Sequence, residues 1–100
     1  MKEFEVTCVN KPDRDNRHEA ISHIGNVNAG WRLTREAAIA RIDSKQEAFY
    51  TIDRKSGKKA MVGVVREAAK APYLRTYADG QWANNLLELA ECDSTCKLIA

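Results

Sequence analysis

Apolar and polar residues alternate with a period of two at the start of the chain. Over residues 3–9, Phe4, Val6 and Cys8 fall on one face, which is the pattern of a half-buried strand. Further strands are predicted from apolar, aromatic and β-branched residues over residues 19–24, 49–53, 60–66 and 73–78. Gly57 lies between the strands over 49–53 and 60–66, so we expect these two to form an antiparallel hairpin.

A helix is predicted over residues 35–44. Thr34 is a suitable N-cap because its hydroxyl can accept an amide proton from the first turn, and Glu36 places negative charge where the helix dipole favours it. The apolar stripe consists of Ala38, Ile39 and Ile42. A short second helix or helical turn is expected within residues 81–89, where Trp82, Leu86 and Leu89 are spaced by four and three.

These elements predict an α+β domain. The order is strand, strand, helix, three strands and short helix, which indicates a small, mostly antiparallel sheet of about five strands with the main helix on one face. One hundred residues suffice for one domain over 1–100. We expect its core within about residues 3–92 and a frayed tail over 93–100.

Composition and charge narrow the class of protein. With 44% hydrophobic and 30% charged residues the chain is typical of a globular protein. The net charge of +2 implies no polyanionic partner, but residues 54–78 hold seven basic residues against one acidic, a balance of +6. No signal peptide and no apolar run of about 18 residues is visible. The three cysteines are expected to be reduced thiols in a cytoplasmic protein without membrane contact.

Several short motifs resemble a known family. They are His23-Ile24-Gly25, Trp31-Arg32-Leu33-Thr34, Ala38-Ile39 with Ile42, Phe49-Tyr50, Tyr73-Leu74-Arg75-Thr76, Asp79-Gly80, and Asn85-Leu86-Leu87 with Leu89 and Cys92. The pattern is similar to a bacterial family of small proteins catalogued as domain of unknown function 3892, over about residues 19–92. This resemblance implies a shared fold and shared positions, and it carries no activity.

The most specific stretch of the chain is residues 73–87. On the predicted strand Arg75 and Asp79 share a face with Tyr73 and Tyr77. One interpretation is an ion pair that fixes the strand to the turn. The other is a guanidinium held by a carboxylate to receive an anionic ligand between two tyrosines.

Two asparagines and two tryptophans have similar alternatives. Asn84 and Asn85 are suited to satisfying backbone groups of a turn, or to hydrogen bonding a partner. Trp31 and Trp82 are expected to be core or rim residues rather than stacking platforms.

The tip of the predicted hairpin is basic. It carries Arg54, Lys55, Lys58 and Lys59. A β-ribbon with such a tip can contact phosphates, although charge also serves solubility at an exposed turn. Nucleic-acid binding through this tip is therefore an alternative function that we do not favour from sequence.

Catalytic and metal signatures are weak. Cys8 is predicted to point inward, and Cys92 and Cys96 have no neighbouring histidine signature of a thiolate enzyme. Pairing Cys92 and Cys96 with His18 and His23 is a weak match to a zinc site. The scattered glycines form no phosphate-binding loop.

We therefore expect no cofactor, no metal and no catalytic set. The sequence favours a regulatory or binding module that contacts a protein or small ligand through the face bearing Tyr73, Arg75, Tyr77 and Asp79. An enzyme acting on a small polar substrate is a further alternative. A monomer or weak dimer is expected.

Overall fold

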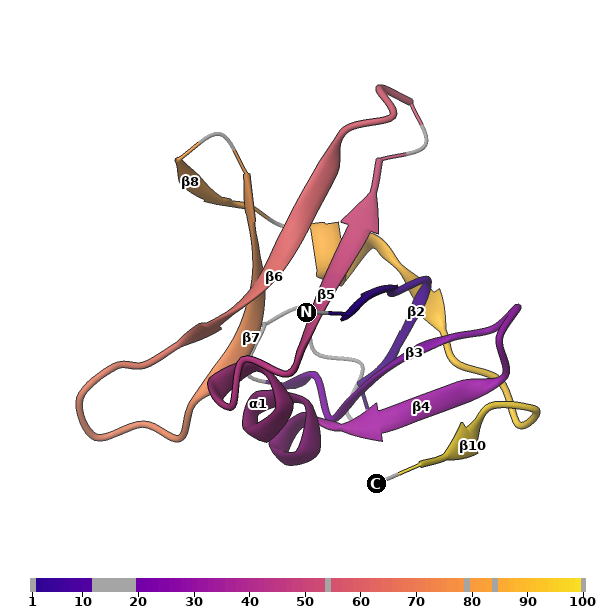
Figure 1. Ribbon diagram of the computed structural model, residues 1–100, viewed down its shortest axis with the longest axis horizontal. Helices are drawn as coiled ribbons and strands as arrows, with labels where there is room; N and C mark the ends of the chain where they lie inside the picture. The colour runs from indigo at the N-terminus through magenta and orange to yellow at the C-terminus, as the bar shows by residue number, and fades with distance from the viewer. Residues whose placement is uncertain (1, 12–19, 54, 79, 84, 100) are drawn as a thin grey trace.

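The computed structural model describes residues 2–11, 20–53, 55–78, 80–83 and 85–99 (Figure 1). These residues form ten strands in two mixed five-strand sheets, one α-helix and a 3-10 turn, and the α+β class is confirmed. The first sheet contains, in spatial order, β1 (Lys2–Glu5), β5 (Glu47–Ile52), β6 (Lys59–Val65), β7 (Tyr73–Ala78) and β8 (Gln81–Ala83). The second contains β10 (Lys97–Leu98), β4 (Trp31–Thr34), β3 (His23–Asn26), β2 (Cys8–Asn10) and β9 (Ala90–Glu91).

The single strand expected over residues 3–9 is two strands in two different sheets. The amide of Val6 donates to the Tyr50 carbonyl of the first sheet (2.7 Å), and the next amide, of Thr7, donates to the Gly25 carbonyl of the second (2.9 Å). The chain therefore changes sheets between two consecutive residues. The expectation of one sheet is corrected to two, because period-two alternation does not say which partner a strand pairs with.

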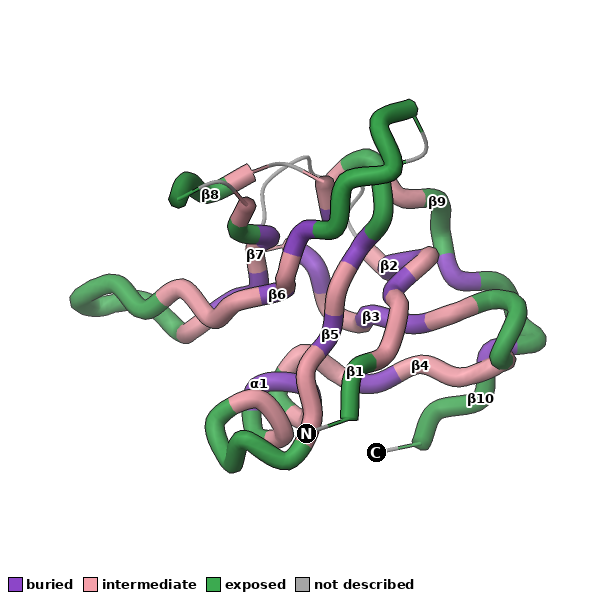
Figure 2. Tube along the Cα trace, turned by 45° about the horizontal axis from the view of Figure 1, so that its top comes forward, coloured by how far each residue is buried: buried purple, intermediate pink, exposed green. Residues whose placement is uncertain are grey.

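The core lies between the two sheets and under α1 (Arg35–Asp43), which packs against strands of both. Its buried residues are Val6, Val9, Ile21, Ile24, Leu33, Ala38, Ile39, Phe49, Val62, Leu74 and Leu86. Figure 2 shows buried segments along strands of both sheets and exposed residues at the β5–β6 hairpin tip. No helix among the described residues is long and apolar enough to cross a membrane.

Locally encoded elements match their predictions closely. Thr34 caps α1 by accepting the amide proton of Ala37 at 3.1 Å, as expected. The β5–β6 hairpin is antiparallel, with Tyr50 opposite Met61, and Gly57 has a φ of +72° in its turn. The range of β7 is the predicted one.

Other predictions need correction. The strand expected over 19–24 is displaced to β3, and part of the loop expected between residues 27 and 33 belongs to β4. The helix expected within 81–89 is replaced by β8 and the 3-10 turn η2 (Asn85–Glu88), because β8 pairs with the edge of β7. The segment expected to fray contains β10, in which Lys97 pairs with Trp31.

Candidate functional site

A row of four large side chains crosses the outer face of the first sheet. The strand register places Tyr50 opposite Met61, Met61 opposite Tyr77 and Tyr77 opposite Trp82. Directly opposed residues point to the same face, with neighbouring strands about 4.8 Å apart. We call Tyr50, Met61, Tyr77 and Trp82 the aromatic row. It lies on the side of the sheet that faces away from the core, because the alternating residues Val62 and Thr76 are buried.

Tyr77 and Trp82 are the most exposed part of this row. Their side chains are 44% and 43% exposed, and their ring centroids lie 5.2 Å apart in an edge-to-face arrangement. A core position for Trp82 is therefore wrong, because β8 is an edge strand with its tryptophan on the outer face. Trp31 is partly buried and packs against Phe4 and Phe49, with ring centroids 6.2 and 6.0 Å away.

The two other described residues of the predicted face differ in environment. Tyr73 is buried, and its hydroxyl donates to Oε1 of Glu67 at 2.9 Å, which lowers the pKa of that carboxyl. Tyr73 is thus part of the scaffold. Arg75 is half-buried, and its Nε donates to the Ala83 carbonyl of β8 at 3.2 Å. Asp79 lies outside the described residues, and its pairing with Arg75 stays a prediction.

The basic hairpin adjoins the aromatic row. Nζ of Lys59 lies 4.4 Å from the centroid of the Tyr50 ring, within cation–π range, and forms an ion pair with Glu3. Lys55 and Lys58 are exposed at the turn. The Lys55 amide donates to Oδ1 of Asp53 at 2.8 Å and lowers the pKa of that carboxyl, so the tip also holds an anionic group. Arg54 lies outside the described residues.

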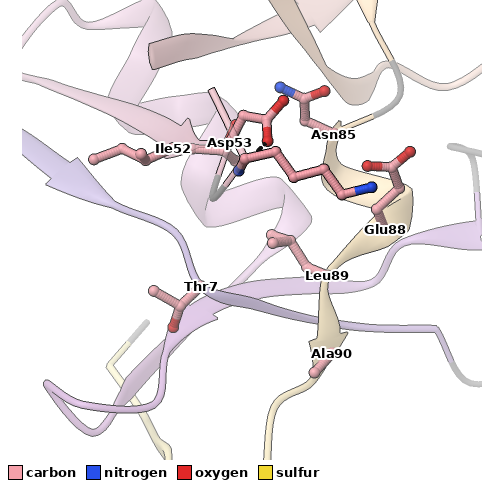
Figure 3. A pocket seen from close by; sticks show the side chains of 9 residues that line it. Thr7, Ile52, Asp53, Asn85, Glu88, Leu89 and Ala90 are labelled. Atoms are coloured by element: carbon pink, nitrogen blue, oxygen red, sulfur yellow. Dashed lines mark hydrogen bonds between the residues drawn. The ribbon is translucent and has the colours of Figure 1, made fainter. Parts of the chain in front are cut away.

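A cleft of about 570 Å³ lies between the two sheets near the hairpin (Figure 3). It is lined by Thr7, Thr51, Ile52, Asp53, Lys55, Asn85, Glu88, Leu89 and Ala90. The cleft brings together Lys55 and Asn85, which the sequence predicted as parts of separate sites. The hydroxyl of Thr51 is buried and has no hydrogen-bond partner within the described part of the chain. Two carboxylates line the cleft against one ammonium, so an anionic ligand is disfavoured there.

A second recess of about 250 Å³ connects the hairpin with β8. Its lining includes Lys58, Lys59, Trp82 and Asn85. The backbone amide of Asn85 donates to Oγ1 of Thr76 at 3.2 Å, which ties the start of η2 to β7. The turn role expected of the Asn85 side chain stays a prediction. Asn84 lies outside the described residues. The recess places two lysines of the hairpin close to the exposed tryptophan, a relationship that the sequence did not indicate.

The cysteines are not three independent reduced thiols. Cys8 and Cys92 form a disulfide, and Cys96 is a buried free thiol. The expectation of reduced cysteines is corrected for the first two. Strand β9 lies parallel to β2, and the Cys92 amide donates to the Val9 carbonyl at 3.1 Å, so the chain beyond β9 lies against β2. No sequence signal marks a contact between residues separated by 84 positions.

The histidines do not complete a cysteine-based catalytic set in the described chain. His23 is on β3, and its Nδ1 lies 2.8 Å from the Ser22 hydroxyl. Burial, followed by the positive charge of Arg32, lowers its pKa. His23 is not part of the group of metal-ligating side chains formed by the three cysteines. His18 lies outside the described residues.

The comparison with protein families agrees with the resemblance seen in the motifs. Residues 5–90 match the family described as "Protein of unknown function (DUF3892)". The chain belongs to this family. The matched range contains the aromatic row, the basic hairpin and Cys8, and it ends before Cys92 and Cys96. No curated protein and no solved structure matches the chain.

Proposed function

We propose that the protein is a binding module whose contact surface is the aromatic row, and that the partner which fits this surface best is a single-stranded nucleic acid. The main observation in support of this proposal is the exposed pair Tyr77 and Trp82 on an open sheet face, with ring centroids 5.2 Å apart. Bases stack on such side chains for about 1–3 kcal/mol each. An open row across several strands suits an extended polymer better than an enclosed small molecule.

Cations at the margin of the row support a polyanionic partner. Lys59 lies over the Tyr50 ring, and Lys58 shares a recess with Trp82. Arg75 is half-buried on the same face of β7. Glu3 offsets part of this charge through its ion pair with Lys59. We therefore expect stacking to contribute most of the affinity and phosphate contacts to be few.

A protein partner is the competing occupant of this face. Tryptophan, tyrosine and arginine are the residues enriched in energetically dominant positions of protein interfaces. The two occupants differ in their dependence on salt, because phosphate contacts release counterions and give a steep decrease of affinity with ionic strength. The positive charge beside the row makes nucleic acid the occupant that we favour.

The test is a titration with a mixed-sequence single-stranded oligonucleotide, followed by tryptophan fluorescence. We expect Trp82 to be quenched and the partly buried Trp31 to respond little. Trp82→Ala and Tyr77→Ala should each weaken binding by about 1–3 kcal/mol. The double variant Lys58→Glu, Lys59→Glu should weaken binding and lower its dependence on salt.

Leu98→Ala provides the matched control, because Leu98 is 52% exposed on the second sheet, away from the row. This variant should bind like the parent chain. Absence of oligonucleotide binding, or binding that is equally strong in Trp82→Ala, would contradict the proposal. Capture of a defined protein partner that requires Trp82 and is insensitive to salt would assign the row to protein binding instead.

A further inference from the structure

The three cysteines form a compact sulfur cluster on the outer side of the second sheet. Cys8 comes from β2, Cys92 follows β9, and Cys96 precedes β10. Their Sγ atoms all lie within 4.8 Å of one another, and the three residues are 0%, 9% and 4% exposed. Residues far apart in the chain thus place three soft donor atoms around one point.

The backbone around the cluster leaves room for the sulfurs. Gly25 of β3 lies opposite Cys8, and a Cβ added to Gly25 would approach Sγ of Cys92 to 3.0 Å and the Trp31 carbonyl oxygen to 2.5 Å. Any larger residue would clash with the Trp31 backbone and crowd the Cys92 sulfur. Cys96 Sγ lies 3.9 Å from the Asn26 carbonyl, on the same side of the sheet.

We propose that the reduced form of this cluster is a three-thiolate site for a thiophilic divalent cation of the Zn²⁺ class. Tetrahedral bonds of about 2.3 Å between zinc and thiolate hold sulfur atoms about 3.8 Å apart. The three sulfurs already lie within 4.8 Å of one another. The two bonded sulfurs must move apart, and the Cys96 sulfur must approach them by about 1 Å at most. Thiolates select soft cations over Mg²⁺ and Ca²⁺. Within the described chain no His, Asp or Glu lies within that distance of all three sulfurs. Oδ1 of Asp93 lies 4.0 Å from Cys96 Sγ, so the fourth position falls to this carboxylate or to water.

The surroundings can offset the charge of such a site. Three thiolates and one divalent cation carry a net charge of −1. Arg32 on β4 lies opposite Gly25. A Cβ added to Gly25 would lie 3.0 Å from the Arg32 Cβ and 3.0 Å from the Cys92 Sγ, so Arg32 is close to the cluster. The Arg32 guanidinium donates to Oδ1 of Asn10 at 3.3 Å, and Nδ2 of Asn10 donates to the Cys92 carbonyl at 3.3 Å. The positively charged guanidinium of Arg32 is thereby held beside the cluster.

The disulfide and the bound cation are mutually exclusive states. A dithiol reductant supplies two electrons and two protons to the bond between Cys8 and Cys92, which yields two thiols, and the reductant becomes a disulfide. The divalent cation then displaces one proton from each of the three thiols as the three metal–sulfur bonds form. The oxidised chain, with Cys96 as its sole thiol, has no such site.

The experiment compares zinc uptake by the reduced and oxidised chain. The protein is reduced with a dithiol, and the dithiol is then removed under anaerobic conditions. The reduced protein is titrated with Zn²⁺ in competition with a chromophoric chelator. We expect one Zn²⁺ per reduced chain, none per oxidised chain, and a higher Tm of the reduced chain when Zn²⁺ is present. Cd²⁺ should give an ultraviolet thiolate-to-metal charge-transfer band with the intensity of three thiolates.

Cys96→Ser is the decisive variant, because it keeps the disulfide and therefore the oxidised fold. After reduction, its affinity for Zn²⁺ should fall below that of the parent chain. The decrease should exceed the roughly 10- to 100-fold that is typical when a hydrogen-bond partner of a metal ligand is lost. Its Tm should not respond to Zn²⁺. No zinc uptake by the reduced parent chain, or equal uptake by Cys96→Ser, would overturn the proposal.

Discussion

The indole ring of Trp82 lies over Gly63, although the two residues belong to β8 and β6 with β7 between them. A Cβ added to Gly63 would meet Cζ3 of Trp82 at 3.1 Å and Cη2 at 3.2 Å. The absence of a side chain at this position therefore allows the ring to lie across the sheet. The same arrangement keeps Trp82 beside Tyr77, so one glycine helps to set the geometry of the aromatic row.

Gly63→Val should lift Trp82 from the sheet. The valine side chain occupies the space of the ring, and the exposed indole can move outward. We expect stronger quenching of its fluorescence by acrylamide and weaker binding of the oligonucleotide. The unfolding free energy should change by no more than about 1 kcal/mol. Replacing a glycine within a strand is stabilising because it lowers the entropy of the unfolded chain, and this gain offsets the lost packing of the Trp82 ring.

Trp82→Phe supplies the background that isolates this effect, since Trp31 is then the sole tryptophan. In that background Gly63→Val should leave acrylamide quenching unchanged. Quenching that rises equally with and without Trp82 would mean that the valine disturbs the core around Trp31 and not the row.

Thr34→Ala should destabilise the protein through the start of α1. The Thr34 hydroxyl accepts the Ala37 amide proton at 3.1 Å, and alanine leaves that donor without its capping oxygen. We expect a loss of about 1 kcal/mol in urea unfolding. Thr34→Ser retains the hydroxyl and should stay close to the parent. Equal losses in both variants would attribute the effect to the threonine methyl group.

The elements that sequence predicted well are those whose determinants are local. The cap at Thr34, the glycine turn at Gly57 and the alternation across residues 73–78 each lie within a few positions of the structure they specify. The helix and the central strands of the first sheet follow from such signals. Tyr77 was also identified as part of the candidate site, because alternation on β7 determines its face.

The features that sequence missed depend on contacts between distant segments. The short strands β8, β9 and β10 are too brief to show alternation, and their pairing partners define them. The disulfide joins residues 84 positions apart. The aromatic row required the register of four strands, and only that register relates Tyr50 to Trp82. Tyr73 shares the face of Tyr77 by alternation, but it is buried and its hydroxyl is bonded to Glu67.

Loss of the disulfide should reduce the stability of the oxidised protein strongly. The bond closes a loop of 84 positions and so restricts the unfolded chain. Replacing Cys8 and Cys92 together by alanine should cost about 2–5 kcal/mol in denaturant unfolding under oxidising, metal-free conditions. Cys96→Ala is the matched control and should lose much less. A double variant as stable as the control would show that the crosslink contributes little.

Leu86→Ala should be among the most damaging substitutions near the candidate cleft. Leu86 lies on η2, is fully buried, and belongs to the core cluster. We expect a loss of about 2–5 kcal/mol in urea unfolding, because the truncation leaves a cavity. Leu98→Ala removes the same atoms from a side chain that is 52% exposed and should change stability by less than about 0.5 kcal/mol. Similar losses in the two variants would contradict the assignment of η2 as a core element.

The bond between Tyr73 and Glu67 should make stability depend on pH in the acid range. The Tyr73 hydroxyl, with a smaller contribution from Lys70, lowers the pKa of Glu67 below its ordinary value of 4.5. A lowered pKa in the folded state means that the unfolded chain binds more protons, so stability rises with pH through this range. The contribution is present above the unfolded pKa and is lost as pH falls through the folded pKa. Tyr73→Phe removes the donor and should flatten the pH dependence of the unfolding free energy around and below the ordinary carboxyl pKa of 4.5. Tyr77→Phe changes an exposed tyrosine of the same strand and should leave that slope intact. Parallel pH curves for Tyr73→Phe and the parent chain would show that the bond does not influence the ionisation of Glu67.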